Sequence, residues 1–416
     1  MSSNSVEVAV IGGGAAGIAA ARKLTKHGID CLIVEARDRL GGRAYTLLSH
    51  PAGHALDMGC GWLHSADRNP WTAIATAQGR AFNKAPPPWD RPMMTHVVPL
   101  AVQEDYARAM NALFGRMAEA ANAGHDAAAS EFLEPGNKWN GTLNAVATFI
   151  SGVELEHMSA VDFDRYGESD SEVDWRLFDG YGTLIASHGH GIPVALDCEV
   201  TRIDHRGKRL RIETKKGVIE ADQAIVTLPT SILGERADLF LPALPDKTAI
   251  ARRLPLGLDD KLFLALEGAE EFGSDSRVLG RLDTSATASY QFRPFDRPMI
   301  EAYFGGACAR ELEAGGEAAF FDFAVTELTG LFGSAFARRL KPIGIHLWGA
   351  DPFAGGAYSY AVPGAADQRA ALAAPVDNRL FFAGEACSRF DFSTAHGAYV
   401  TGHEAAERIL AARRKS

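Results

Sequence analysis

The pattern of apolar and polar residues predicts a strand, a tight turn and a helix near the N-terminus. Residues 6–11 form a short apolar run that passes directly into the glycine-rich segment 12–17. An alanine-rich stretch with helical spacing follows to about residue 26, and a second apolar run lies at 30–35. Together these segments form a β-α-β unit of about 30 residues, which is typical of a parallel α/β sheet.

Further along the chain, helical and strand-like regions alternate. Two stretches at 103–129 and 137–163 predict a separate helical region. Alternating residues at 194–203 and 210–226 predict the strands of a β-meander beside the first sheet. Later segments predict a strand at 261–267, a strand at 380–383 and a final helix over about 395–413.

The composition is that of a folded protein with an acidic charge balance. The chain has 416 residues, 47% of them hydrophobic and 23% charged, which predicts two or three domains with large cores. Its net charge of −10 has the wrong sign for binding a phosphate backbone, so we expect no nucleic-acid partner. The acidic balance either weakly favours cationic ligands or reflects a solvated surface.

Cysteine usage and hydropathy bear on the compartment. The five cysteines lie far apart without a Cys-X-X-Cys pair, so we expect neither a disulfide framework nor a metal site. This usage is typical of a reducing compartment, and the predicted location is the cytoplasm. The N-terminus has no basic leader, and no run of about 18 apolar residues occurs, so no membrane segment is expected.

Three glycines and a glutamate fit a dinucleotide-binding fingerprint. Gly12, Gly14 and Gly17 come directly after the first strand and open the helix. Gly12 permits a tight turn, Gly14 lets the backbone approach a pyrophosphate, and Gly17 lets the helix pack closely on the strand. Glu35 ends the second strand, where a carboxylate binds ribose hydroxyls and disfavours NADP. The alternative is a glycine-rich turn without function.

Two further segments favour FAD over NAD, because an extended cofactor needs contacts at both of its ends. Arg37 and Arg43 are placed to reach the pyrophosphate, and Gly42 lets the backbone pass close to the cofactor. Each arginine taken alone is also explained as a solvated surface charge. Gly384 and Glu385 follow the strand near the C-terminus, where a carboxylate is suited to a second polyol such as ribitol.

The predicted fold class is α/β, with a Rossmann-type FAD-binding domain interleaved with an α+β substrate-binding domain. The domains are expected to interleave because the strand at 380–383 is expected to rejoin the N-terminal sheet. The predicted FAD-binding domain comprises residues 1–65, 180–230 and 342–416, and the predicted substrate-binding domain comprises 66–179 and 231–341.

These residues resemble a known family, the flavin-dependent amine oxidases, which include monoamine and polyamine oxidases. The segment 57–64 is similar to the polyamine-oxidase version of the block that follows the fingerprint. The resemblance implies an FAD domain and a substrate domain with the flavin ring between them. The matching blocks are residues 8–46, 56–70, 179–229, 254–266, 348–360 and 380–410.

Lys261 is the leading candidate for a catalytic residue. A lysine inside an apolar strand is costly to bury unless it is hydrogen-bonded or neutral. The alternative is an edge strand from which the ammonium reaches solvent. The resemblance implies that Lys261 hydrogen-bonds a water near flavin N5.

The resemblance also implies residues around the flavin ring. Trp348 and Tyr358 match a block that supplies one wall of an aromatic cage for the amine. Ala357 stands where the monoamine oxidases carry the cysteine that bonds to the flavin, so FAD is expected to be noncovalent. Thr394 occupies the position of the second cage tyrosine, which argues against a two-tyrosine cage. It is also a good N-cap for the final helix, whose positive end would face flavin N1 and O2.

The segment 62–176 is expected to shape the entrance to the site. His64 matches a histidine that influences proton transfer or amine binding in some polyamine oxidases, and the alternative is a structural histidine. Acidic residues of the segment 62–176 either attract a polycation or form a solvated face; they include Asp162, Asp164, Glu168 and Asp170. The predicted catalytic residues are Trp62, His64, Lys261, Tyr358 and Thr394. The predicted cofactor-binding residues are Gly12, Gly14, Ala15, Ala16, Gly17, Glu35, Ala36, Arg37, Gly42, Arg43, Gly59, Gly61, Trp62, Val200, Trp348, Gly384, Glu385, Thr394 and Ala395.

The reaction implied by the resemblance is FAD-dependent oxidation of an amine. Hydride passes from the carbon next to a neutral amine to flavin N5, the imine is hydrolysed, and O₂ is reduced to H₂O₂. The expected partners are a small amine, O₂ and a second copy of the chain in a homodimer. Three alternatives stay open: a flavin oxidase or desaturase acting on a nonamine substrate, an NAD-linked dehydrogenase, and a noncatalytic FAD-binding protein.

Overall fold

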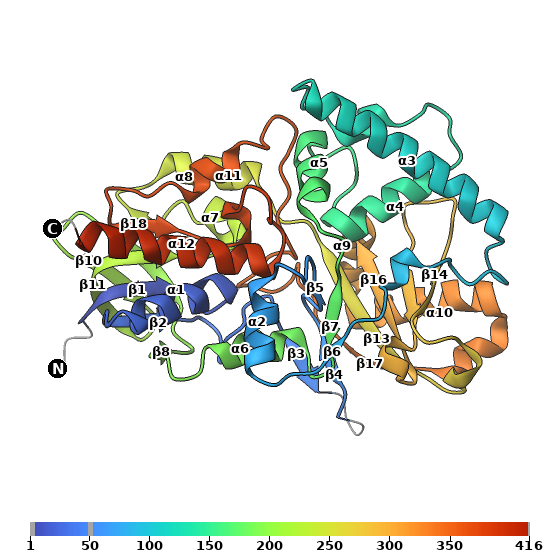
Figure 1. The fold of residues 1–416 in the computed structure, drawn as a ribbon, viewed down its shortest axis with the longest axis horizontal. Coiled ribbons are helices and arrows are strands. Elements are labelled where there is room, and N and C mark those ends of the chain that lie inside the picture. The colour runs from blue at the N-terminus through green and yellow to red at the C-terminus, as the bar shows by residue number, and fades with distance from the viewer. Residues whose placement is uncertain (1–4, 49–52, 415–416) are drawn as a thin grey trace.

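The chain folds into two lobes, each built around a large sheet, in a computed structural model that describes residues 5–48 and 53–414 (Figure 1). The first lobe contains an eight-stranded mixed sheet, and the second contains a five-stranded antiparallel sheet. Short strands lie between the lobes. These are β3 (Thr46–Leu48), β4 (Ala55–Asp57), β5 (Trp62–Leu63), β6 (Phe82–Asn83) and β7 (Trp175–Leu177).

The first sheet begins with the predicted β-α-β unit. β1 (Ser5–Ile11) and β2 (Cys31–Val34) run parallel, with Ala9 opposite Leu32, and α1 (Ala15–Lys26) connects them. The order across the sheet is β12-β9-β10-β11-β1-β2-β8, and β18 also pairs with β11. The remaining strands are β8 (Val194–Ala195), β9 (Val200–Asp204), β10 (Leu210–Thr214), β11 (Gly217–Val226), β12 (Phe240–Leu241) and β18 (Leu380–Phe382).

Distant segments of the chain meet at β11. Its first half pairs antiparallel with β10, and its second half pairs parallel with β18, where Ile225 lies opposite Phe381. On its other side, β11 runs parallel to β1, with Ala224 opposite Ala9. The C-terminal strand therefore rejoins the N-terminal sheet, which confirms the predicted interleaved α/β fold. The predicted meander is part of this same sheet and does not lie beside it.

Helices cover both faces of the first sheet, because alternate residues of a strand point to opposite faces. Val8 and Val10 belong to a core shared with α1 and α12 (Ala395–Arg413), whereas Ala9 and Ile11 belong to a separate core. The latter core includes Ala251 of α8 (Pro245–Arg253). The other helices of this lobe are α2 (Pro70–Ala77), α6 (Tyr181–His188), α7 (Thr230–Glu235) and α11 (Gln368–Ala373).

The second sheet has the order β14-β15-β16-β13-β17, so β13 (Asp259–Leu266) is an interior strand between β16 (Met299–Gly305) and β17 (Leu340–Ile345). The edge-strand alternative for Lys261 is therefore wrong, because β13 is paired on both sides. The predicted helical region lies above this sheet in Figure 1. The other elements of the lobe are β14 (Ser276–Leu279), β15 (Ser289–Phe292), α3 (Leu100–Asn122), α4 (Asn140–Ser151), α5 (Ala160–Ser169), α9 (Gly306–Gly315) and α10 (Glu317–Phe332).

The chain crosses between the lobes at positions that differ from two predicted boundaries. β12 lies beyond residue 230 but pairs with β9 of the first sheet, with Phe240 opposite Ile203. Leu233 and Leu254 are buried in the same core, so the first lobe extends past the predicted boundary. The physical reason is that these apolar residues cover a face of the first sheet. β17 continues to Ile345, past the boundary at residue 342, because it pairs with β13.

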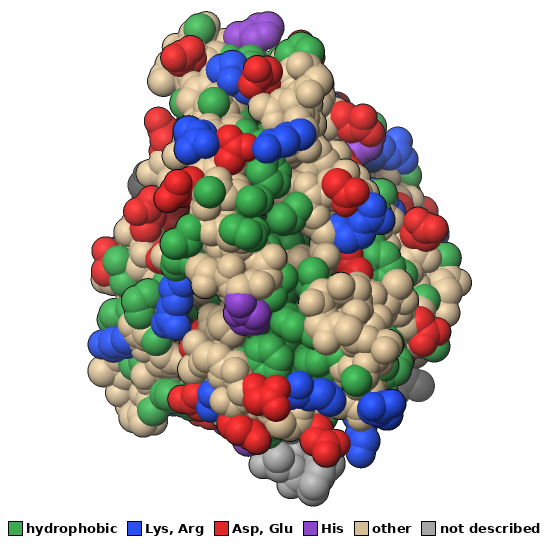
Figure 2. All heavy atoms as spheres, turned by 90° about the vertical axis from the view of Figure 1, so that its right-hand side faces the viewer, with side chains coloured by type: hydrophobic (Ala, Val, Ile, Leu, Met, Phe, Trp, Pro, Cys, Tyr) green, Lys and Arg blue, Asp and Glu red, His purple; other side chains and the backbone are tan. Residues whose placement is uncertain are grey.

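The outer face of the second lobe carries both signs of charge. Apolar side chains gather in the middle of this face, with Lys, Arg, Asp and Glu interspersed around them (Figure 2). Among the described residues, no helix combines the length and the apolar character needed to cross a bilayer.

Candidate active site

A long cavity runs between the two lobes. Its volume is about 920 Å³, and residues of both lobes line it. In the first lobe it is lined by the glycine turn after β1, Glu35 and Val200, and in the second lobe by residues of the helical region such as Phe149. Lys261 and Glu385 line the same cavity. The cavity therefore connects the dinucleotide fingerprint with the lysine strand.

The glycine turn leaves space where a phosphate backbone contact is expected. Gly12 has φ +104°, a conformation that favours glycine. A Cβ on Gly14 would meet other atoms only at 3.9 Å, so this position is open on its cavity side. A Cβ on Gly17 would lie 1.9 Å from the carbonyl oxygen of Gly12, so Gly17 serves helix packing, and it does not line the cavity. The first-turn residues Ala15 and Ala16 do line it, at the positive end of α1.

Glu35 is fixed at the end of β2 by backbone groups. Its carboxylate accepts hydrogen bonds from the N–H groups of Gly13 at 2.6 Å and Arg37 at 2.8 Å. The side chain is buried and lines the cavity together with Ala36 and Val200. This placement suits the contact with ribose hydroxyls that the sequence predicts.

Arg37 does not offer a free cation to a pyrophosphate. Its guanidinium binds Asp351 through two hydrogen bonds of 2.7 Å, and it lies over the ring of Phe353. This bidentate ion pair uses Nη1 and Nη2 of Arg37, which was expected to reach the pyrophosphate. The position of Arg37 on the cavity wall is as expected, but its charge is balanced within the protein.

Arg43 and Glu385 form a second ion pair, on the wall of the central part of the cavity. Arg43 donates to Glu385 at 2.9 Å and to the carbonyl of Ala357 at 2.8 Å. Glu385 also accepts from Ser359 Oγ at 2.6 Å and from the N–H of Ser393 at 2.9 Å. Burial raises the pKa of Glu385, but Arg43 and the hydrogen bond from Ser359 outweigh it and hold the pKa below its ordinary value.

The N-terminus of α12 lies on the same cavity wall. Thr394 is its N-cap, because its Oγ1 accepts a hydrogen bond from the N–H of Gly397 at 3.0 Å. Thr394 and Ala395 line the cavity beside Gly384 and Glu385. The predicted N-cap is confirmed, and the positive end of the helix is directed at a region suited to negative charge.

Taken together, these residues fit an extended dinucleotide. The cavity has an open glycine turn at a helix N-terminus, an acid at the end of β2, and a polar wall made by Arg43, Glu385 and the start of α12. Cys60 also lines the cavity, and burial raises the pKa of its thiol to about 12.

Lys261 is buried within the second lobe and held by two oxygens. Only 6% of the residue is exposed, its Nζ donates to the carbonyl of Asp57 at 3.1 Å, and Glu301 Oε1 lies 3.4 Å away. Glu301 in turn accepts from the hydroxyl of Tyr303 at 2.7 Å. The Nζ also lies 5.2 Å from the ring centroid of Tyr303, so the charge is balanced and one N–H group has a hydrogen-bond acceptor.

Two aromatic side chains flank this region. Tyr358 lines the cavity, and its hydroxyl donates to the carbonyl of Phe149 at 2.9 Å. Burial raises the pKa of this hydroxyl well above its ordinary value. Trp348 is buried and donates from Nε1 to the carbonyl of Met58 at 2.9 Å. The indole thereby packs beside Gly59, where a Cβ would lie 3.1 Å from the Trp348 ring.

His64 forms a hydrogen-bonded ion pair at the exposed end of the cavity. Its Nδ1 lies 2.8 Å from Asp174 Oδ1. Burial lowers the pKa of His64, but the hydrogen bond and charge of Asp174 outweigh it and raise the pKa above the ordinary value. The Trp62 and Trp89 rings meet edge to face with centroids 4.5 Å apart. Trp89 is 44% exposed, so an aromatic pair stands next to the histidine where the cavity meets solvent.

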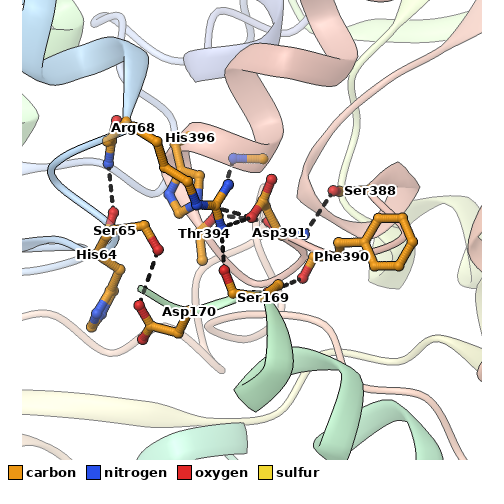
Figure 3. A network of polar contacts seen from close by, with 12 residues as sticks. His64, Ser65, Arg68, Ser169, Asp170, Ser388, Phe390, Asp391, Thr394 and His396 are labelled. Atoms are coloured by element: carbon orange, nitrogen blue, oxygen red, sulfur yellow. Dashed lines mark hydrogen bonds and ion pairs between the residues drawn. The ribbon is translucent and has the colours of Figure 1, made fainter. Parts of the chain in front are cut away.

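A polar network ties this end of the cavity to the start of α12 (Figure 3). Ser65 donates to Asp170 at 3.0 Å, and Arg68 binds both the carbonyl of Ser169 and the carboxylate of Asp391, the latter at 2.7 Å. Asp391 belongs to the loop that precedes Thr394. The network therefore joins the segment that carries His64, the end of α5 and the loop before α12.

Nearly all predicted site residues line this one cavity. The five predicted catalytic residues do so, and every predicted cofactor-binding residue does so except Gly17. Of the four acids proposed at the entrance, Asp170 alone lines it among the described residues. Asp162 is instead buried in a bidentate ion pair with Arg369, with hydrogen bonds of 2.9 and 2.8 Å.

Sequence reasoning missed several residues of the cavity region. Glu301 balances Lys261, Asp174 binds His64, and Asp351 binds Arg37. Of these, Glu301 had a signal in the sequence, as did the cavity-lining Asp259. Glu301 and Asp259 are acids inside otherwise apolar strand segments, which is the same anomaly that identified Lys261.

The fold, together with a cavity that fits a dinucleotide at the glycine turn and at the start of α12, defines a flavin-binding oxidoreductase. The chain belongs to the flavin containing amine oxidoreductase family, whose sequence profile matches residues 67–410. Residues 10–76 also match an NAD(P)-binding Rossmann-like domain. FAD is the cofactor of this family, and the substrates of amine oxidases are amines.

Similar proteins support this assignment. Polyamine oxidase 2 of Arabidopsis thaliana is 27% identical over 98% of this chain and 88% of its own length. The lysine-specific histone demethylase 1 homolog 2 of Oryza sativa subsp. japonica is 28% identical over 97% of this chain, which spans 57% of that protein. The fold resembles that of a putrescine oxidase variant redesigned at its cofactor site, with a TM-score of 0.74, 18% identity, and coverage of 98% of this chain and 99% of the other.

Proposed function

We propose that this oxidoreductase oxidises a cationic di- or polyamine at a C–N bond, with O₂ as the electron acceptor. FAD held by the glycine turn after β1, Glu35 and the start of α12 would supply the two-electron acceptor for the hydride lost from the carbon next to the neutral nitrogen, and O₂ would take up these electrons as H₂O₂. Water then hydrolyses the substrate imine to an aldehyde or ketone and ammonia or an amine. The proposal rests chiefly on one observation: the residues that fit a dinucleotide, Lys261 and a set of carboxylates line one cavity, and Glu301 balances the charge of Lys261 from behind the cavity wall.

The lysine supplies proton donors at the wall of the reaction site. Its ammonium carries three N–H groups, of which one donates to the carbonyl of Asp57, while Glu301 balances the charge. The side chain is thus held in place and keeps donor capacity for a water molecule. This arrangement supports the predicted role of Lys261 in orienting a water near the reacting atoms.

Aromatic residues limit the access of water. Tyr358, Tyr303 and Trp62 line the cavity, and all three are largely buried. Their ring faces attract a positively charged or partly charged amine and leave little room for solvent. A dry wall of this kind favours the neutral form of the reacting nitrogen, whose lone pair assists loss of hydride.

Carboxylates gather at the solvent end of the cavity and favour a cation. Asp90 and Glu172 are exposed there, and Asp170 and Asp174 lie further in. This end of the cavity therefore attracts positive charge, and a cavity of about 920 Å³ accommodates an extended chain beyond the cofactor. The similarity to polyamine oxidases points to the same substrate class.

An anaerobic substrate screen tests the proposal. The holoenzyme is mixed with putrescine, spermidine, n-butylamine or n-butanol, and the flavin absorbance near 450 nm is followed. We expect bleaching with the di- or polyamine, a slower reaction with n-butylamine and none with the alcohol, followed by H₂O₂ formation when O₂ is admitted. A flavin that no amine reduces would exclude the proposed function and favour a nonamine substrate or a noncatalytic role.

A further inference from the structure

A second ionisable residue of β13 faces the same cavity. Asp259 lies two residues before Lys261, so the two side chains project from the same face of the strand. Both residues line the cavity. The intervening residue, Asp260, points the other way, and its Oδ1 accepts a hydrogen bond from the N–H of Trp348 at 2.9 Å. The alternation of the strand thus places Asp259 on the cavity wall.

Asp259 is nine-tenths buried and incompletely hydrogen-bonded. The residue is 9% exposed, and its Oδ1 has no hydrogen-bond partner among the described residues. Gly305 lies directly opposite in β16 and has no side chain to cover the carboxyl group. An unsatisfied buried carboxyl oxygen is costly, which is typical of a group whose partner is a ligand.

The charged neighbours of Asp259 do not supply that partner. Lys261 is close enough to lower its pKa, but the ammonium already has Glu301 at 3.4 Å. Glu301 raises the pKa of Asp259. Tyr358 is close enough to hydrogen-bond the Asp259 carboxyl group and lower its pKa, but its hydroxyl also donates to the carbonyl of Phe149 at 2.9 Å, and Oδ1 of Asp259 stays without a partner among the described residues. Burial is the largest effect and raises the pKa of Asp259 well above its ordinary range. A bound cation would reverse this effect.

We propose that Asp259 binds a cationic nitrogen of the substrate inside the cavity, beside Lys261 and Tyr358. This inference rests on the proposed amine substrate and identifies the residue that selects for its charge. The carboxylates at the solvent end would attract the amine, and Asp259 would hold one of its nitrogens at depth. A carboxylate in a dry site binds an ammonium or guanidinium group more strongly than an exposed one does.

The test compares two ligands that differ in charge and little in shape. Butylguanidine is a permanent cation, and butylurea is its neutral counterpart. Binding of each to the FAD-loaded enzyme is measured by calorimetry for the wild type, Asp259→Asn and Asp259→Leu. Asp322→Asn, which removes an exposed carboxylate on α10, is the control for net charge.

We expect both Asp259 variants to bind butylguanidine about 10- to 100-fold more weakly than the wild type does. Their affinity for butylurea should stay within about threefold, and Asp322→Asn should match the wild type with both ligands. Unchanged affinity for butylguanidine in both Asp259 variants would overturn the inference. So would an equal loss of affinity for both ligands, which would indicate a structural role.

A second measurement uses the wild type alone and does not depend on the folding of a variant. If Asp259 ionises when the cation binds, a proton is released near neutral pH, and the binding heat depends on the ionisation enthalpy of the buffer. Butylguanidine should show this dependence and butylurea should not; equal behaviour of the two ligands would contradict the inference. Charge-selective binding by an enzyme whose flavin no amine reduces would refute the proposed function without refuting this cation site.

Discussion

The ammonium nitrogen of Lys261 lies 3.4 Å from Oε1 of Glu301, and the two side chains form a buried ion pair across neighbouring strands β13 and β16. Each side chain is less than one-tenth exposed. Such a pair contributes little net stability, because desolvation of two charges offsets their attraction. Loss of one partner, however, leaves the other charge buried and alone. The pair therefore makes the position of Lys261 sensitive to a residue outside the predicted site.

Replacement of Lys261 separates its structural role from its chemical role. Lys261→Met leaves Glu301 without its cation and should destabilise the protein by about 3–5 kcal/mol. The double variant Lys261→Met, Glu301→Leu removes both charges and should recover most of this loss. Both variants should turn over amines slowly. The measurements are thermal midpoints at saturating FAD, together with stopped-flow flavin reduction and reoxidation.

The rate of flavin reduction and reoxidation in the double variant decides between the structural and the chemical role of Lys261. If the thermal midpoint and the rate recover together, Lys261 acts only through the fold, and its proposed role with water is wrong. If the single variant keeps the wild-type midpoint, the two buried charges are not energetically coupled.

The His64–Asp174 pair predicts a pH-dependent part of the stability. The folded-state pKa of His64 is raised above its usual 6.5, since Asp174 outweighs the effect of burial. A raised histidine pKa stabilises the fold fully below the unfolded value and loses this contribution as the pH rises through the folded value. The thermal midpoint of the wild type minus that of His64→Gln should therefore fall as the pH rises above about 6.5.

Asp174→Asn provides the matched control, because it keeps the hydrogen-bonding shape and removes the charge. When Asp174→Asn is present, the change in thermal midpoint caused by His64→Gln should no longer depend on pH above about 6.5. If the thermal midpoints of the wild type and His64→Gln differ by the same amount at every pH, the raised pKa of His64 is contradicted.

Much of the fold follows from local sequence patterns. The β-α-β unit, the N-cap at Thr394 and the return of the strand at 380–383 depend on short apolar runs and glycine placement, which act locally. The lobe boundaries depend on long-range pairing. β12 is two residues long, and its assignment depends on pairing with a strand about 40 residues earlier, which no local pattern encodes.

In the candidate site, too, single residues can be identified from local sequence, whereas their partners depend on long-range contacts. Lys261 stands out in the sequence because it interrupts an apolar strand, but its partner Glu301 lies on another strand, and only the register of β13 and β16 brings them together. Arg37 was assigned to phosphate, whereas Asp351, more than 300 residues away, binds its guanidinium. Ion pairs between such distant residues depend on the tertiary fold and not on local spacing.

Thr394 should contribute to stability through the N-cap of α12. Its Oγ1 accepts from the N–H of Gly397 at 3.0 Å, and Thr394→Ala removes this bond at a cost of about 1 kcal/mol. Thr394→Ser keeps the hydroxyl and should restore the wild-type thermal midpoint. If the helix end also stabilises negative charge on the cofactor, Thr394→Ala lowers the flavin reduction potential, and spectroelectrochemistry would detect the shift. An unchanged potential with a lower midpoint would limit Thr394 to capping.

FAD should be released intact when the protein is denatured. Ala357 offers no nucleophile, and burial raises the pKa of the cavity-lining Cys60 to about 12, so its thiol is protonated at neutral pH. Because the thiolate is the reactive form, attachment of Cys60 to the cofactor is disfavoured. Precipitation with acid should leave a yellow supernatant and a colourless pellet. A yellow pellet that turns colourless in Cys60→Ser would show a covalent link at that residue.

Gly14 and Gly17 should respond to alanine in opposite ways, although both belong to the fingerprint. Gly14 has extended backbone angles that any residue adopts, and an added Cβ would meet protein atoms only at 3.9 Å, so Gly14→Ala should fold normally. That Cβ would project toward the space expected for the pyrophosphate, so most of the purified variant should be colourless. An added Cβ on Gly17 would lie 1.9 Å from the carbonyl oxygen of Gly12, so Gly17→Ala should lower the thermal midpoint of the apoprotein itself.

The ratio of absorbance at 450 nm to that at 280 nm measures bound FAD, and the thermal midpoint without added FAD measures the stability of the apoprotein, so together they distinguish the two effects. A Gly14→Ala variant that binds FAD as well as the wild type would show that the phosphate does not approach this turn.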